Sequence, residues 1–132
     1  MQAGGGGVIV LPLLFLLQPQ VDCNEPITQR DMNFCSHQEF EAADKALNEQ
    51  WRKVAAHKKR DDEAAARNEA EGGYFQKLLD AQRAWLAYRD NHCEAVSDVY
   101  RGGSIRPLIH NLCMAELTAQ RTDQLQKMIE PN

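Results

Sequence analysis

The sequence predicts an all-α fold, an antiparallel helical hairpin plus a third helix, closed by two disulfides. Three observations predict it. Apolar residues recur at three- and four-residue steps in three long segments, which is the pattern of buried helical faces. No segment of useful length shows the alternation of a half-buried strand. Four cysteines lie in a chain of 132 residues, which has room for one domain with a modest core. We therefore expect a three-helix bundle.

Residues 1–22 have the character of a signal peptide. The apolar run Val8–Leu17 has the length of a signal-peptide hydrophobic region and is too short to span a bilayer. No Lys or Arg precedes the run, and no Ala-x-Ala motif precedes Cys23, so an apolar N-terminal arm is the alternative. We expect residues 1–22 to be removed on export and residues 23–132 to form the domain.

The first helix is expected over residues 28–58. Thr28 can cap it while Asp31 completes a capping box, and Pro26 prevents an earlier start. The apolar positions that follow define one buried face: Met32, Cys35, Phe40, Ala43, Leu47, Trp51 and Val54.

Residues 55–73 form a charged connector with strong helix formers and almost nothing to bury. Two interpretations remain open. The segment can prolong the first helix, or it can fray into a mobile connector that ends at Gly72 and Gly73. In both cases we expect a solvated hairpin tip that projects from the bundle.

The second helix is expected from Tyr74 to Tyr100, ending at the Gly102–Gly103 pair. Ser104 can cap the third helix, whose first turn tolerates Pro107. The second helix has one apolar face, made by Leu78, Ala81, Trp85, Tyr88, His92, Val96 and Val99. The third has a broad apolar stripe, made by Leu108, Ile109, Leu112, Cys113, Leu117, Leu125 and Met128.

Helix geometry selects one of the three possible cysteine pairings. Cys93 and Cys113 lie nine residues before and ten residues after the Gly102–Gly103 pair, so both sit about 14 Å back along antiparallel helices. Cys23 lies just before the first helix, and Cys35 is in its second turn. Pairing Cys23 with Cys35 and Cys93 with Cys113 follows, as staples at the two ends of the bundle. Each bridge closes a short loop and contributes about 3 kcal/mol.

A zinc site is the alternative use of two of these cysteines, because His92 precedes Cys93 and His110 lies three residues before Cys113. No second Cys-x-x-Cys supports it. No HExxH motif is present, and cysteines held in disulfides cannot act as nucleophiles. We therefore expect no catalytic residues, no metal, no cofactor and no enzymatic activity.

Two arginines fall on apolar faces, Arg89 four residues before Cys93 and Arg121 four residues after Leu117. Buried guanidinium groups require a carboxylate. Asp44 is the best-placed one, with Asn48 a turn further on. We therefore hypothesise an Asp44–Arg89–Arg121 network linking all three helices, and expect that replacing Asp44 with alanine costs several kcal/mol.

The charge balance limits the class of partner. The formal net charge is −4, and removing residues 1–22 takes away only one charged side chain, Asp22. The chain lacks the dominant basic patch of a nucleic-acid binder and the basic amphipathic face of a membrane-surface helix. A basic protein partner fits the acidic domain better.

Several spaced segments, in order, resemble the LprI-type lysozyme-inhibitor family. The resemblance covers roughly residues 23–128 and includes all four cysteines. The matching segments are Thr28–Cys35, Ala43–Asn48, Ala81–Cys93, Gly102–Ser104 and Cys113–Arg121. The resemblance implies an exported, helical, disulfide-bonded bacterial domain, periplasmic or secreted, whose namesake is a lipoprotein that inhibits lysozyme. This chain lacks the small residues of a lipobox before Cys23, which puts lipid anchoring in doubt.

Two functions follow as hypotheses. The first is that the domain binds and blocks a basic lysozyme or related muramidase. The candidate binding residues are Ser104 and Arg106 in the turn before the third helix, and Asp61, Asp62 and Glu63 at the acidic tip. The second is a periplasmic structural or adaptor module that docks another envelope protein, which an exposed apolar strip on the third helix would favour.

Overall fold

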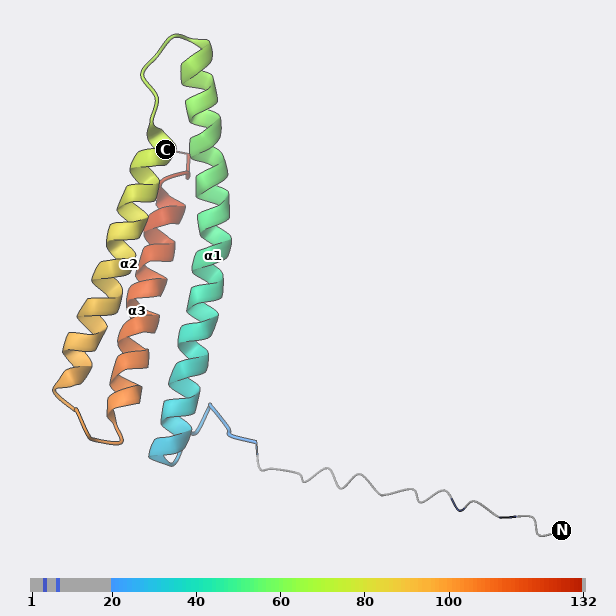
Figure 1. Cartoon of the computed structure of the whole chain (residues 1–132), viewed down its shortest axis with the longest axis vertical. Helices are drawn as coiled ribbons and strands as arrows, with labels where there is room; N and C mark the ends of the chain where they lie inside the picture. The colour runs from blue at the N-terminus through green and yellow to red at the C-terminus, as the bar shows by residue number, and fades with distance from the viewer. Residues whose placement is uncertain (1–3, 5–6, 8–19, 132) are drawn as a thin grey trace.

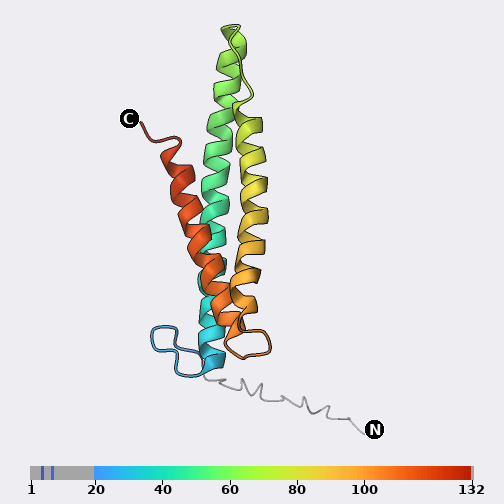
Figure 2. The same ribbon diagram turned by 90° about the vertical axis from the view of Figure 1, so that its left-hand side faces the viewer.

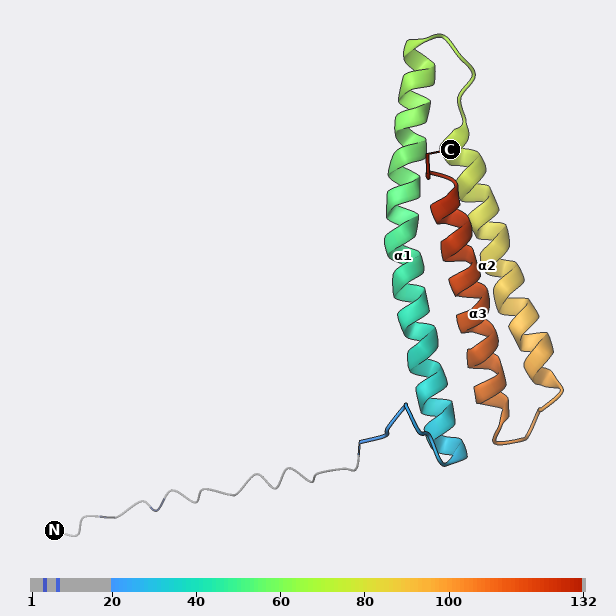
Figure 3. The ribbon, with the colours of Figure 1, turned by 180° about the vertical axis from the view of Figure 1, so that it is seen from behind.

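A computed structural model describes residues 4, 7 and 20–131, which form three antiparallel helices. They are α1 (Gln29–Arg67), α2 (Tyr74–Asp98) and α3 (Arg106–Lys127). The chain runs up α1, down α2 and up α3, and the three axes lie side by side (Figures 1 and 3). The all-α, three-helix fold predicted from the sequence is confirmed. The expected signal peptide falls almost entirely outside the described residues.

The start of α1 is set by the capping box expected from the sequence. The Thr28 side chain accepts a hydrogen bond from the Asp31 backbone N–H at 3.0 Å, and the Asp31 carboxylate accepts one from the Thr28 N–H at 3.5 Å. These bonds satisfy two backbone donors that the first turn leaves without helical partners.

Helix α1 continues to Arg67, well beyond the boundary expected near residue 58. Residues 55–67 therefore prolong the first helix, and only residues 68–73 connect it to α2. Strong helix formers account for this result, together with the burial of Ala55 and Ala65. The long α1 and the connection rise beyond the end of α3, so the tip does project (Figure 2).

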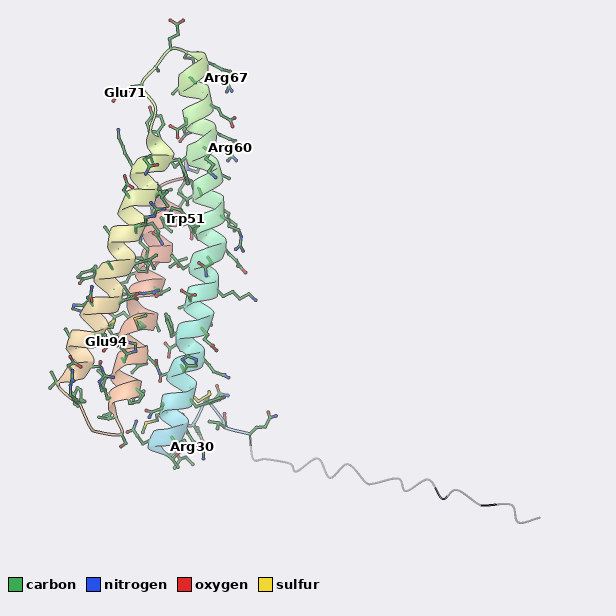
Figure 4. The ribbon with its side chains drawn as sticks, in the orientation of Figure 1. Arg30, Trp51, Arg60, Arg67, Glu71 and Glu94 are labelled. Atoms are coloured by element: carbon green, nitrogen blue, oxygen red, sulfur yellow. A yellow bond between two sulfur atoms is a disulfide. The ribbon has the colours of Figure 1, made fainter. Side chains whose placement is uncertain are left out.

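The core lies along the inner faces of all three helices. Its buried side chains are Leu47, Val54, Leu78 and Leu125, and Trp51, Trp85 and Ile129 pack against them. Figure 4 shows Trp51 on the side of α1 that faces the other helices. Helix α1 packs more extensively against α3 than against α2.

The structure pairs Cys23 with Cys35 and Cys93 with Cys113, as helix geometry predicts. The Cα atoms are 5.5 and 5.6 Å apart, and no cysteine in the described chain is free. The bridges do not staple opposite ends, however. Both lie near the end where α1 begins and the α2–α3 turn is found. The expectation of one bridge at each end was wrong, because Cys35 and Cys113 are both in the second turn of their helices.

The opposite end is closed by Asp62 of α1. Its carboxylate accepts hydrogen bonds from the backbone N–H groups of Gly73 and Tyr74 at 2.8 Å and of Phe75 at 3.0 Å. These are the first donors of α2, whose own cap residue, Gly73, has no side chain to offer. Asp62 thus caps α2 from the neighbouring helix, and the N–H groups of Phe75 and Tyr74 lower the pKa of its carboxyl.

Replacing Asp62 with alanine should lower the melting temperature by about 5 °C at neutral pH, the effect of losing a helix cap. Because the folded pKa lies below the ordinary value of 3.8, the stabilisation is present above that value and disappears as the pH falls through the folded pKa. The difference in melting temperature between the unsubstituted protein and Asp62→Ala should therefore disappear under acidic conditions. Thermal melts at a series of pH values would show this.

Asp61 provides the matched control. Its carboxylate contacts only His57 and Lys58 within α1, at 3.2 and 3.4 Å, in a solvated setting. Asp61→Ala removes the same charge without uncapping α2, so its melting temperature should stay within about 1 °C. Equal losses in the two variants would refute the capping role.

Candidate functional site

The buried polar residues meet in a layer halfway along the bundle, but their pairing differs from the expected network. The Arg89 side chain is only 8% exposed. Its Nη1 lies 3.5 Å from Asp44 Oδ1 and 3.2 Å from Thr118 Oγ1, and its Nε lies 3.0 Å from Asp90 Oδ1. The Asn48 side chain donates to Asp44 at 3.3 Å. Arg89 thus links all three helices.

Arg121 does not join Asp44. Its Nε donates to Gln82 Oε1 at 2.9 Å and its Nη1 to Gln124 Oε1 at 3.1 Å, while Nη2 is buried with no hydrogen-bond partner among the described residues. The hypothesis that Asp44 joins both guanidiniums was wrong for Arg121, since Arg121 lies at the level of Gln82, about two turns of α2 from Arg89. Burial lowers the pKa of Arg121, although an arginine stays protonated.

Trp85 lies between the two guanidiniums. The Arg89 Cζ is 5.2 Å from the centre of its ring and the Arg121 Cζ is 5.9 Å from it. Phe40 of α1 also contacts Arg89, at 5.5 Å. Cation–π attraction to these rings therefore offsets part of the cost of burying the two guanidinium groups, which carboxylates do not fully offset. These contacts lie inside the bundle, so the layer has the character of a structural clamp.

At the acidic tip, two of the three candidate binding residues are engaged within the protein. Asp62 caps α2, and Asp61 contacts His57 and Lys58. Only Glu63 is exposed without such a partner among the described residues. Figure 4 shows Arg67 and Glu71 at this same end, so the tip carries both signs of charge. The tip is thus a weak candidate for a binding site.

At the other end, the α2–α3 turn is a braced protrusion. Gly102 has φ +83°, a left-handed conformation that glycine adopts without strain. The Gly103 N–H donates to the Tyr100 carbonyl at 2.9 Å, and Asn33 of α1 donates its side-chain N–H to the Ser104 carbonyl at 2.9 Å. The turn is therefore held to the start of α1.

Ser104 does not cap α3, in contrast to the expectation. The cap position is Ile105, and no side chain bonds to the first turn. The helix begins at Arg106, whose Nη2 lies 2.7 Å from Glu94 Oε2 and 3.1 Å from Asp98 Oδ1 of α2. The hydrogen bonds that Arg106 donates to Asp98 and then to Glu94 raise the pKa of Arg106. Arg106 is thus occupied in fixing the turn and is not free to reach a partner.

The sequence did not identify the side chains that the turn presents outward. Val99 is 82% exposed, the Arg101 side chain is 76% exposed, and Tyr100 is more than a third exposed. Arg101 makes a surface ion pair with Asp98 at 3.0 Å, which contributes little. The prediction that Val99 lies on the buried face of the second helix was wrong. Tyr88 and Val96 of the same predicted face are exposed as well, because α2 turns the face with Leu78, Arg89 and Cys93 inward. The Gly102–Gly103 pair, three residues after Val99, was the signal that the helix ends nearby.

The described residues contain no group of three or more metal-ligating side chains, and none of their helices is long and apolar enough to cross a membrane. The candidate site consists of the braced turn and the surface beside it. The arrangement offers an apolar side chain, an aromatic ring and a cation on a fixed backbone, which is suited to contact with another protein.

Comparison with known proteins places the chain in a family. A protein of Rhizobium meliloti (strain 1021), with the name uncharacterized protein R02472, is 41% identical over 114 residues, which is 86% of this chain and 82% of that protein. No solved structure matches this chain. The family model described as lysozyme inhibitor LprI matches residues 23–125, and this chain belongs to the LprI lysozyme-inhibitor family.

Proposed function

We propose that this chain is an exported protein-binding domain that inhibits a lysozyme or a related muramidase. The family match over residues 23–125 carries the proposal. The two disulfides support a place outside the cytoplasm, periplasmic or secreted, because such bonds persist in oxidising compartments. The acidic balance supports a basic partner, through faster electrostatic encounter.

The α2–α3 turn is the element that we propose to enter the substrate cleft. Glycoside hydrolases of this kind use paired carboxylates, and Arg101 is the exposed cation at the tip of the turn. Val99 and Tyr100 add apolar contact beside it. Because the turn is braced by Asn33 and Arg106, binding requires little ordering of the backbone, which favours affinity.

The test is the lysis rate of a peptidoglycan suspension by a basic lysozyme, titrated with the disulfide-intact protein up to micromolar excess. Saturable inhibition is expected. Arg101→Glu should weaken it about tenfold. Arg67→Glu changes the net charge equally at the opposite end and should have no effect. Turnover that stays constant across a panel of lysozymes would refute the proposed function, and equal effects of both variants would remove the turn from it.

The adaptor module remains a second candidate because of one observation. Leu112 of α3 and Val96 and Tyr88 of α2 are exposed on the side away from α1, beyond what the core absorbs. A pull-down from envelope extract, repeated with excess lysozyme, separates the two functions. An envelope protein that is retained in the presence of excess lysozyme would favour the adaptor.

A further inference from the structure

A groove lies between α2 and α3, on the side of the bundle away from α1. Its volume is about 360 Å³. Most of the wall is apolar, and the lining residues are His92, Val96, Ile109, Leu112, Cys113, Glu116 and Leu117. Neither the capping interactions nor the polar layer at mid-bundle uses this groove.

The groove has one aromatic border and one acidic border. On α2, the ring of Tyr88 stacks on His92 with centroids 5.2 Å apart, and Tyr88 is more than half exposed. On α3, Glu116 lines the groove and accepts a hydrogen bond from the side-chain amide of Gln120 at 3.2 Å. Asp123 lies seven residues further along α3, which places it on the same helix face.

No lysine or arginine lines the groove, and neither Glu116 nor Asp123 makes an ion pair within residues 20–131. This contrasts with Glu94 of α2, which forms an ion pair with Arg106 at 2.7 Å. The groove is therefore an apolar trough with uncompensated negative charge at its edge. A long aliphatic stem that ends in a cation matches both features, because it buries the stem and pairs the head.

We propose that this groove is a receptor for a lysine or arginine side chain of a basic polypeptide. The stem lies on Val96, Leu112 and Leu117, the charged head meets the Glu116 carboxylate, and the exposed Tyr88 ring adds cation–π attraction. A second copy of this chain is the weaker occupant, because self-association would place acidic faces together in a chain of net charge −4. The proposal does not depend on whether the partner is a lysozyme.

The experiment is a titration of the ¹⁵N-labelled, disulfide-intact protein with an eight-residue oligolysine at low ionic strength, followed by amide chemical shifts. Saturable shifts should centre on Tyr88, Val96, Leu112 and Glu116. Glu116→Gln should weaken binding about tenfold. Glu63→Gln removes the same charge at the distant tip and should leave binding unchanged. Both carboxylates are exposed, so both variants should fold, and equal melting temperatures verify this.

Three outcomes would overturn the proposal. One is a set of shifts spread over all acidic surfaces, with Glu116→Gln and Glu63→Gln acting alike. Another is equal binding of an oligoglutamate of the same length. The third is concentration-dependent dimerisation in sedimentation that Glu116→Gln strengthens, which would assign the groove to a second copy. None of these measurements uses lysozyme, so the groove proposal can be refuted independently of the proposed lysozyme inhibition.

Discussion

Replacing Cys93 and Cys113 together with alanine should lower the free energy of unfolding by about 3 kcal/mol, because the bridge closes a 20-residue loop in the unfolded chain. The sulfur of Cys93 is also enclosed, with no exposed surface, so the substitution leaves a gap between α2 and α3 as well. For a domain of this size that is a large share of the total stability. Urea unfolding, monitored by circular dichroism, measures the loss.

The Cys23–Cys35 bridge is the internal comparison. It closes a 12-residue loop, so the chain-entropy argument alone gives nearly the same value. The segment that it ties down is peripheral, however: Ile27 is 87% exposed, and the bonds of Asn24 and Glu25 are local ones to Asp22. Without the bridge, this segment can detach while the bundle stays folded, so the loss should be less than half as large. Equal losses would mean that the segment folds together with the bundle.

Much of the fold could be predicted from the sequence because helix periodicity and capping are local. Thr28 and Asp31 lie three residues apart, and their bonds follow from that spacing. The pairing of Cys93 with Cys113 could be derived because, in two antiparallel helices joined by a short turn, residues equally far from the turn lie side by side. Each of these inferences needed only one helix or one turn.

The site was less predictable because its contacts depend on the rotation of one helix against another. In the sequence Asp62 looks like a solvated carboxylate, yet it caps a helix that begins twelve residues later. In the sequence Arg106 looks like a free cation, yet it forms ion pairs with two carboxylates of α2. The exposure of Val99 depends on how α2 is rotated in the bundle, because the inward face of α2 carries the polar residues Arg89 and Ser97 where the sequence favoured an apolar stripe.

In the mid-bundle layer, mutations can measure how far the contacts differ from those predicted from the sequence. Arg89→Ala should destabilise the protein by about 3 kcal/mol, because it removes packing against Phe40 and Trp85 and the polar links to α1 and α3. Asp44→Ala should cost only about 1 kcal/mol, less than the sequence alone suggested. The Asp44 side chain is 40% exposed, and Arg89 keeps Asp90 as a partner.

Arg121→Met is the matched control for Arg89, since it removes a guanidinium that is equally buried but donates its hydrogen bonds to amide oxygens and not to a carboxylate. Replacing a buried charge that lacks a carboxylate by an apolar side chain of similar length should change the free energy of unfolding by no more than about 1 kcal/mol, in either direction. Denaturant unfolding of the two variants therefore shows whether Arg89 stabilises the fold more than Arg121 does. If Arg121→Met cost as much as Arg89→Ala, both arginines would belong to one clamp after all, and the ion pair with Asp44 would not be what distinguishes Arg89.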